Sequence, residues 1–188
     1  MGRSWIIGVG AVLTTAAAVS GGVAVAKPVE SGEFHDEFGE LVEDFCDMPG
    51  LTVQIDTVVD GKFRVDTRGR GGLVYFAEHL RAAGTFTNVD NGNVATSVDK
   101  VLNKDLKVID NGDGTLTVIL LATGNATLYD ASGKAIGRNP GQVRFEFLID
   151  DGGTPGDPTD DEVISEDLIK GSTGRTDDFC TVVVPALT

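Results

Sequence analysis

The stretch VATSVDKVLNKDLKVIDNGDGTLTVILLAT, residues 94–123, decides the fold class of this chain. Two apolar-rich segments flank residues 110–114, whose Asn-Gly and Asp-Gly pairs are typical of a tight hairpin turn. From residue 115 to residue 123, successive side chains alternate between two faces, as in a β-strand, and both faces are apolar. The stretch therefore predicts two antiparallel strands, the second of them covered on both sides.

The same pattern of short apolar runs separated by turn residues extends outward in both directions. We expect about eight antiparallel strands joined in sequence by short hairpins, which predicts an all-β up-and-down barrel over residues 47–188. A β-sandwich is the alternative fold. Besides the two strands above, the expected strands lie at 51–56 and 63–68 on either side of a turn at Asp60-Gly61, at 73–88, at 143–149 after a bend at 139–141, and at 162–169 and 179–184.

The segment 27–46 before the barrel has a different spacing of apolar residues. Its apolar side chains recur three and four residues apart, which predicts a short amphipathic helix with acidic residues on the opposite side. Extended structure running into Cys46 is the alternative, because so short a helix needs tertiary contacts to be stable. The apolar residues are Phe34, Phe38, Leu41, Val42 and Phe45.

Residues 1–26 have the three-part layout of a secretory signal peptide. Arg3 provides a short positive head, an apolar run follows, and Ala24 and Ala26 offer the small side chains that a signal peptidase accepts. An N-terminal membrane anchor is the alternative, but no positive cluster follows the apolar run. We therefore expect cleavage after Ala26 and a secreted, extracellular protein.

The net charge limits the possible binding partners, and the cysteine content predicts a disulfide. The chain has 29 acidic residues against 15 Lys and Arg, a net charge of −14. This balance argues against nucleic acid or an anionic membrane as a partner, because both attract positively charged proteins. The two cysteines, Cys46 and Cys180, have one intramolecular pairing, so an exported chain is expected to join them in a disulfide. Two free buried thiols are the alternative.

The strand predicted at 73–88 carries the candidate ligand-binding residues Tyr75, Glu78, His79 and Arg81. Because side chains alternate along a strand, Glu78 lies on one face and the other three lie on the opposite face. Either Glu78 enters the interior as a ligand-anchoring carboxylate, or Tyr75, His79 and Arg81 line a polar cavity. In the simpler reading the strand passes the barrel rim and Glu78 is solvated. With only two histidines and no serine nucleophile motif, no catalytic residue is assigned.

A polar loop at 150–162 supplies candidate metal ligands. Asp150, Asp151, Asp157, Asp160 and Asp161 lie there among glycines and prolines, and oxygen ligands on such a loop suit calcium. The spacing does not match an EF-hand. The alternative is that these residues only form turns.

Several short blocks, taken in order, resemble a group of small secreted actinobacterial proteins to which no activity is attached. They are Phe45-Cys46-Asp47, NGDGTLT at 111–117, RNPGQ at 138–142, GTPGDP at 153–158, and GSTGR at 171–175 leading to Asp178-Phe179-Cys180. The resemblance covers most of residues 34–187. It implies an exported β-barrel similar to the allene oxide cyclase or lipocalin-like barrels, and it carries no catalytic residue to this chain.

Together these features favour a secreted, non-enzymatic module that binds a small, partly apolar ligand inside a barrel. The first alternative is an extracellular interaction protein that acts through acidic, calcium-binding loops, and clustering of those loops at one end would favour it. The second is a cyclase- or isomerase-like enzyme that uses Glu78 or Tyr75. Each inference from a barrel to a function is an analogy, because one fold supports many functions.

Overall fold

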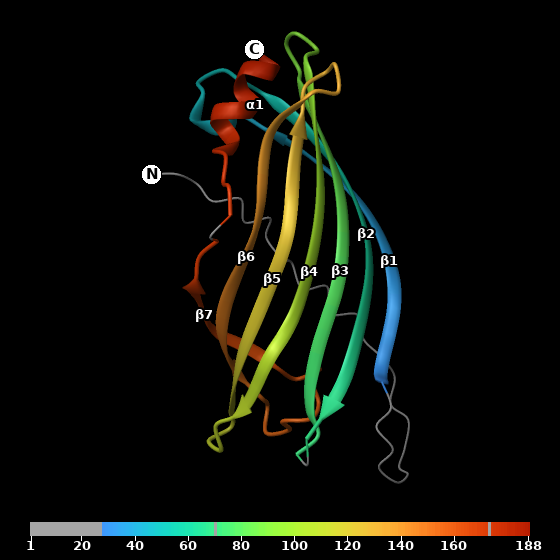
Figure 1. Cartoon of the computed structure of the whole chain (residues 1–188), viewed down its shortest axis with the longest axis vertical. Helices are drawn as coiled ribbons and strands as arrows, with labels where there is room; N and C mark the ends of the chain where they lie inside the picture. The colour runs from blue at the N-terminus through green and yellow to red at the C-terminus, as the bar shows by residue number, and fades with distance from the viewer. Residues whose placement is uncertain (1–27, 70, 173) are drawn as a thin grey trace.

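The computed structural model of the chain describes residues 28–69, 71–172 and 174–188, so the predicted signal peptide lies outside it. Within these ranges, seven antiparallel strands form one sheet in which spatial order follows chain order (Figure 1). The predicted all-β, up-and-down connection of strands is thus confirmed. The strands are β1 (Pro28–Val42), β2 (Val53–Arg68), β3 (Leu73–Asn88), β4 (Val94–Asp110), β5 (Thr115–Tyr129), β6 (Ala135–Asp150) and β7 (Glu162–Lys170), accompanied by a 3-10 turn η1 (Phe45–Asp47) and a helix α1 (Phe179–Leu187).

The main core lies at one end of the sheet, where α1 packs against one face that we call the inner face. Val183 and Leu187 of α1 are fully buried there among Phe86, Leu128 and other apolar side chains. A second, smaller core gathers around Val108 near the opposite end. Between the two cores, alternation along the strands places mostly small and polar residues in the middle of the inner face.

The predicted disulfide between Cys46 and Cys180 is confirmed, with Cα atoms 5.5 Å apart. It joins the turn after β1 to the first turn of α1. The bond spans 134 residues of sequence, and closing so long a loop restricts the unfolded chain strongly. A disulfide of this kind is consistent with an extracellular protein. None of the described helices is long and apolar enough to cross a membrane.

The helix predicted within 27–46 is wrong: the segment forms β1 and then η1. The misleading spacing arises because positions four apart share a face in a strand as well as in a helix. Phe34 pairs directly with Gly61 of β2, and its ring covers the place where a Cβ of Gly61 would sit. Gly39 in the middle of the run also disfavours a helix. The alternative of extended structure is the one that forms.

The strand predicted at 179–184 is also wrong, because this segment is part of α1. The run of three valines favours a strand by propensity. A local cap and tertiary packing together override that preference. The Asp178 carboxylate accepts a hydrogen bond from the Thr181 N–H at 2.8 Å and caps the helix. Packing of Val183 and Leu187 into the main core then stabilises a helix that would be too short to form alone.

Two predicted breaks are absent. The strands predicted at 51–56 and 63–68 form one strand, the segment 179–184 belongs to α1, and β1 is added, so the described ranges hold seven strands where about eight were expected. β2 runs straight through Asp60-Gly61, and β6 runs through residues 139–141. Gly61 serves to accommodate the Phe34 ring, and Pro140 sits opposite Asn125 in the β5–β6 ladder. In these strands glycine and proline therefore accommodate close packing in extended backbone, where turns were expected.

Closure into a barrel is not shown. Within the described ranges β1 pairs only with β2, and β7 pairs only with β6, so the sheet is open between its two edge strands. Both edges expose apolar side chains, including Phe38 on β1 and Leu168 on β7. An open sheet or a sandwich-like arrangement fits the same strand order.

Candidate functional site: the two faces of β3 and β4

The structure separates the four candidate ligand-binding residues that the sequence placed on β3. Glu78 lies on the inner face and is only 9% exposed, whereas His79 and Arg81 lie exposed on the opposite, outer face. The alternation predicted for Glu78, His79 and Arg81 is therefore correct, and the reading in which Glu78 is solvated is wrong. Tyr75 joins the second core and lies apart from His79 and Arg81.

Glu78 has a specific partner in the interior. Its Oε1 accepts a hydrogen bond from the Asn103 side-chain amide at 2.7 Å, and Asn103 lies directly opposite on β4. Asn103 is itself 3% exposed. This pair satisfies one buried carboxylate oxygen with one buried donor, as buried polar groups require.

Tyr75 holds together the region where β3 and β4 separate. The β3–β4 ladder ends at the pair Ala77–Lys104, and beyond it the Val108 N–H donates to the Tyr75 hydroxyl at 3.2 Å. The Arg68 guanidinium lies 4.3 Å from the centre of the Tyr75 ring, a cation–π arrangement. These contacts account for the position of the Tyr75 side chain without a ligand.

Asp105 lies beside this separation and accepts a hydrogen bond from the Phe76 N–H at 2.7 Å. Burial of the carboxyl raises the pKa of Asp105 to about 6, although the Phe76 N–H and the Arg68 charge both act in the opposite direction. The β3–β4 ladder has already ended at this point, so the Asp105 carboxylate replaces a backbone carbonyl of β4 as the acceptor for the Phe76 N–H.

The most unusual group on the inner face is Asp99 of β4, which the sequence analysis did not identify. Asp99 is 4% exposed, and its Oδ2 accepts a 3.3 Å hydrogen bond from the Ser97 hydroxyl. Its Oδ1 is buried and has no hydrogen-bond partner in the described part of the chain. Burial raises the pKa of Asp99 to about 6, and the Ser97 hydrogen bond only partly offsets that effect.

The surroundings of Asp99 are built from small residues. Its direct neighbours across the ladders are Ala82 on β3 and Ala126 on β5. The next inner positions toward the main core include Gly84, where a Cβ would come within 2.8 Å of the Ser97 hydroxyl. Neither direct ladder neighbour of Asp99 therefore has a bulky or basic side chain.

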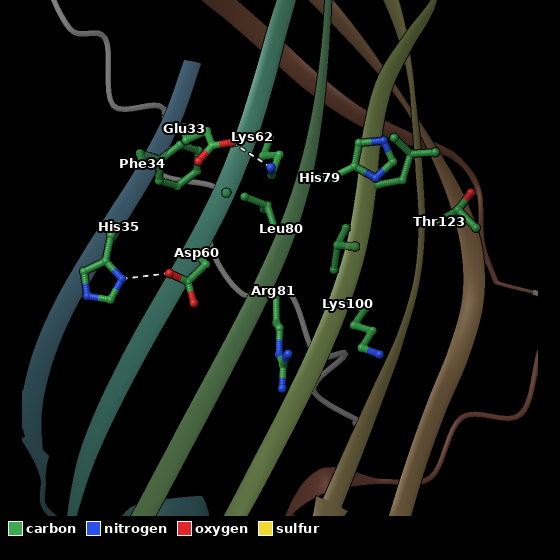
Figure 2. A pocket seen from close by; sticks show the side chains of 13 residues that line it. Glu33, Phe34, His35, Asp60, Lys62, His79, Leu80, Arg81, Lys100 and Thr123 are labelled. Atoms are coloured by element: carbon green, nitrogen blue, oxygen red, sulfur yellow. Dashed lines mark hydrogen bonds and ion pairs between the residues drawn. The ribbon is translucent and has the colours of Figure 1, made fainter. Parts of the chain in front are cut away.

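The outer face of the same strands carries an open hollow of about 710 Å³ (Figure 2). Charged side chains from four neighbouring strands surround it, and two interactions cross between β1 and β2. His35 Nδ1 lies 2.7 Å from the Asp60 carboxylate, and Lys62 Nζ lies 2.6 Å from Glu33. Hydrogen bonding to Asp60 and then to Glu37 raises the pKa of His35. Arg81 and Lys100 complete the charged lining.

The predicted calcium ligands lie on the loop 150–162. Among them, the Asp151 side chain is only 1% exposed. Burial, followed by the negative charges of Asp160, Asp151 and Asp157, raises the pKa of Asp161 to about 6. The Asp150 carboxylate accepts the Gly152 N–H in a local turn. Across the residues that the structure describes, no group of three acidic, histidine or cysteine side chains is arranged to hold a metal ion. The calcium site stays a prediction.

Of the three acidic segments 110–113, 150–162 and 177–178, the first two lie at the same end of the sheet. The Asp151 N–H donates to the Gly114 carbonyl at 3.1 Å, which brings the loop 150–162 against the turn 110–114. The third acidic pair, Asp177 and Asp178, lies beside α1, where the Asp177 carboxylate accepts the Arg138 N–H at 2.9 Å. The clustering expected for an interaction protein is therefore partial.

Comparison with known proteins does not place the chain in a family. No family model matches the chain, and no curated protein and no solved structure matches it.

Proposed function

We propose that this protein is an exported, non-enzymatic binding module that holds a small, partly apolar ligand on the inner face of its sheet. The ligand presents an amine or another strong hydrogen-bond donor to Asp99. The single observation that supports this proposal is the buried Asp99 Oδ1, which has no partner among the described residues.

The energetic argument starts from the state of charge. With a pKa of about 6, the Asp99 carboxyl is mostly ionised at pH 7. Leaving a buried acceptor unsatisfied costs about 1–3 kcal/mol, and more when the acceptor is charged. A ligand that brings a cationic donor to Oδ1 recovers this cost on binding, so Asp99 supplies both affinity and selectivity for a positively charged group.

The arrangement of side chains supports the same location. Ala82 and Ala126 flank Asp99 across the ladders, so its two direct neighbours add little side-chain bulk. The two apolar cores lie on either side of this zone along the strands. Binding sites commonly combine apolar surroundings with a few well-placed polar groups. Here those polar groups are Asp99 and the Glu78–Asn103 pair.

The predicted barrel remains part of the proposal. Closure of β1 toward β7 would enclose the ligand, whereas an open sheet would bind the same chemical group in a trough. Secretion is likewise proposed from the signal-peptide pattern of residues 1–26, and the Cys46–Cys180 disulfide supports it.

Native mass spectrometry of the mature protein, purified from its own culture medium, tests the proposal. We expect the wild type to carry a stoichiometric ligand with a mass of about a few hundred daltons, the size that a pocket of ordinary volume accepts. Asp99→Asn should lose this mass, and the matched control Asp90→Asn, on an exposed turn, should keep it. Bare wild-type protein, or equal loading of Asp99→Asn, would contradict the proposal.

The second candidate is an interaction protein that acts through its acidic loops. The contact between the loop 150–162 and the turn 110–114 favours it, since two acidic loops then form one surface. The cyclase or isomerase hypothesis has no comparable support, because Asn103 already engages Glu78, and Tyr75 already accepts the Val108 N–H.

A further inference from the structure

Arg81 and Lys100 form an unusual pair on the outer face. They lie directly opposite each other in the β3–β4 ladder, and both side chains are exposed. Like charges at directly opposite positions of an antiparallel ladder destabilise the sheet. The arrangement is more notable because the chain is strongly acidic, with 29 acidic residues available to neutralise 15 basic ones.

Neighbouring cations on this face have acidic partners. Lys62 pairs with Glu33 at 2.6 Å, and Arg64 pairs with Asp66 at 2.7 Å. Within the described ranges, by contrast, neither Arg81 nor Lys100 forms an ion pair.

The one acid in register with this pair bonds to a histidine and not to either cation. Asp60 lies directly opposite Arg81 in the β2–β3 ladder, but His35 Nδ1 holds its carboxylate at 2.7 Å. Figure 2 shows Asp60 linked to His35, while Arg81 and Lys100 extend in the same direction without a link to any drawn residue. The two positive charges therefore remain available to a ligand.

The shape of the surface suits a small ligand. Arg81 and Lys100 line the open hollow of about 710 Å³, together with His79 and Thr123, which can offer hydrogen bonds to a ligand. An arginine provides a planar fork for two oxygens of an anion, and a lysine adds a mobile point charge.

We propose that Arg81 and Lys100 form an oxyanion-binding site on the outer face, which takes a carboxylate, sulfate or phosphate group of a small ligand. The anion lies between the two side chains and relieves their mutual repulsion. The site is separate from the inner face, so it does not depend on the function proposed for Asp99.

An NMR titration of the isotope-labelled mature protein tests this site at about 150 mM salt, where non-specific attraction between exposed charges is largely screened. Inorganic phosphate, sulfate and acetate are the probes, which separates tetrahedral from planar anions. We expect saturable shifts of the amides at 79–81 and 100–102 with at least one probe. Uniform, non-saturating shifts over all exposed cationic residues would overturn the proposal.

Three variants make the test specific. Arg81→Gln/Lys100→Gln should bind the same probe at least tenfold more weakly, and the control Lys107→Gln/Lys134→Gln, which removes two exposed cations elsewhere, should bind it as the wild type does. Lys100→Glu should abolish binding and raise the melting temperature, because the introduced carboxylate would pair with Arg81. Unchanged binding in either Lys100 variant, with its fold confirmed by its amide spectrum, would refute the site.

Discussion

Replacement of Asp99 by asparagine should make the protein more stable at neutral pH. The Asp99 pKa rises from 3.8 to about 6 on folding because the carboxyl is buried without a counter-charge. At about 1.4 kcal/mol per pH unit, this increase corresponds to a penalty of about 3 kcal/mol once the carboxyl is ionised in both states. Asparagine keeps a side-chain oxygen for the Ser97 hydroxyl and carries no charge, so it removes most of that penalty.

The pH dependence follows from the direction of the change. A carboxyl with a raised pKa binds its proton more tightly in the folded protein, so it opposes folding only where the unfolded chain ionises. The penalty is absent below about pH 3.8, grows between about 3.8 and 6, and is constant above about pH 6. Asp99→Asn should therefore exceed the wild type by about 3 kcal/mol at pH 7 and by about 0.5 kcal/mol at pH 4.

Urea unfolding of ligand-free, refolded protein at both pH values measures this difference. Asp105, whose pKa is also raised to about 6, is present in both proteins and cancels in the comparison. Asp90→Asn controls for the loss of one negative charge and should leave the unfolding free energy unchanged. A stability difference that is the same at pH 4 and pH 7, or an Asp99→Asn variant less stable than the wild type at pH 7, would refute the reasoning.

Three further predictions concern the α1 end and the acidic loop. Leu187→Ala should lower the unfolding free energy by about 2–5 kcal/mol, because Leu187 is fully buried in the main core; urea unfolding measures it, and a loss below about 1 kcal/mol would mean that α1 is not docked. Cys46→Ala/Cys180→Ala should cost at most about 4–5 kcal/mol, and calorimetry should show the same lowered melting temperature for reduced wild type. Calcium at millimolar concentration should raise the melting temperature of the wild type but not of Asp161→Asn, and an unchanged wild-type midpoint would end the calcium hypothesis.

Most of the sheet could be predicted from the sequence, because the residues at several turns are typical of tight hairpins. Residues 110–114 contain two glycines with positive φ, Gly112 and Gly114, and this turn was predicted where it occurs. The long strand 73–88 was also predicted with the bounds that the structure has. Positive φ at a turn is a local demand that only a few residue types meet, so it can be read from one sequence.

The errors arose where tertiary contacts decide the structure. The pair Asp60-Gly61 is typical of a turn. In the structure, however, Gly61 leaves room for the ring of Phe34, which is 27 residues earlier in the chain. The valines of α1 favour a strand, yet a capped and disulfide-linked segment packs as a helix. Neither partner is visible from local pattern, because pairing and docking bring together residues that are distant in sequence.

Asp99 was missed for a related reason. In the sequence, Val94, Thr96 and Val98 alternate with Ala95, Ser97 and Asp99, and this pattern predicts burial of the larger, more apolar set. The structure buries the smaller and more polar set, because the inner face continues from Ala95, which lies fully buried in the main core under α1. One buried position fixes the face of every other residue along a regular strand, and no local preference at Asp99 can reverse it.

The alternation of side chains along β3 and β4 also decides which charged groups reach each face of the sheet. On β3 and β4, the alternation that places Ala95 in the core sends to the inner face a carboxylate, Asp99, whose Oδ1 has no hydrogen-bond partner among the described residues. It sends two opposed cations to the outer face. Either feature alone lowers stability, and simple substitutions such as Asp99→Asn or Lys100→Glu would relieve it. Natural proteins break local rules of packing and charge mainly at functional or strained sites. Two such violations on opposite faces of one strand pair therefore favour a module with two separate binding surfaces of opposite charge preference, and the Asp99 and Arg81/Lys100 variants test each surface independently.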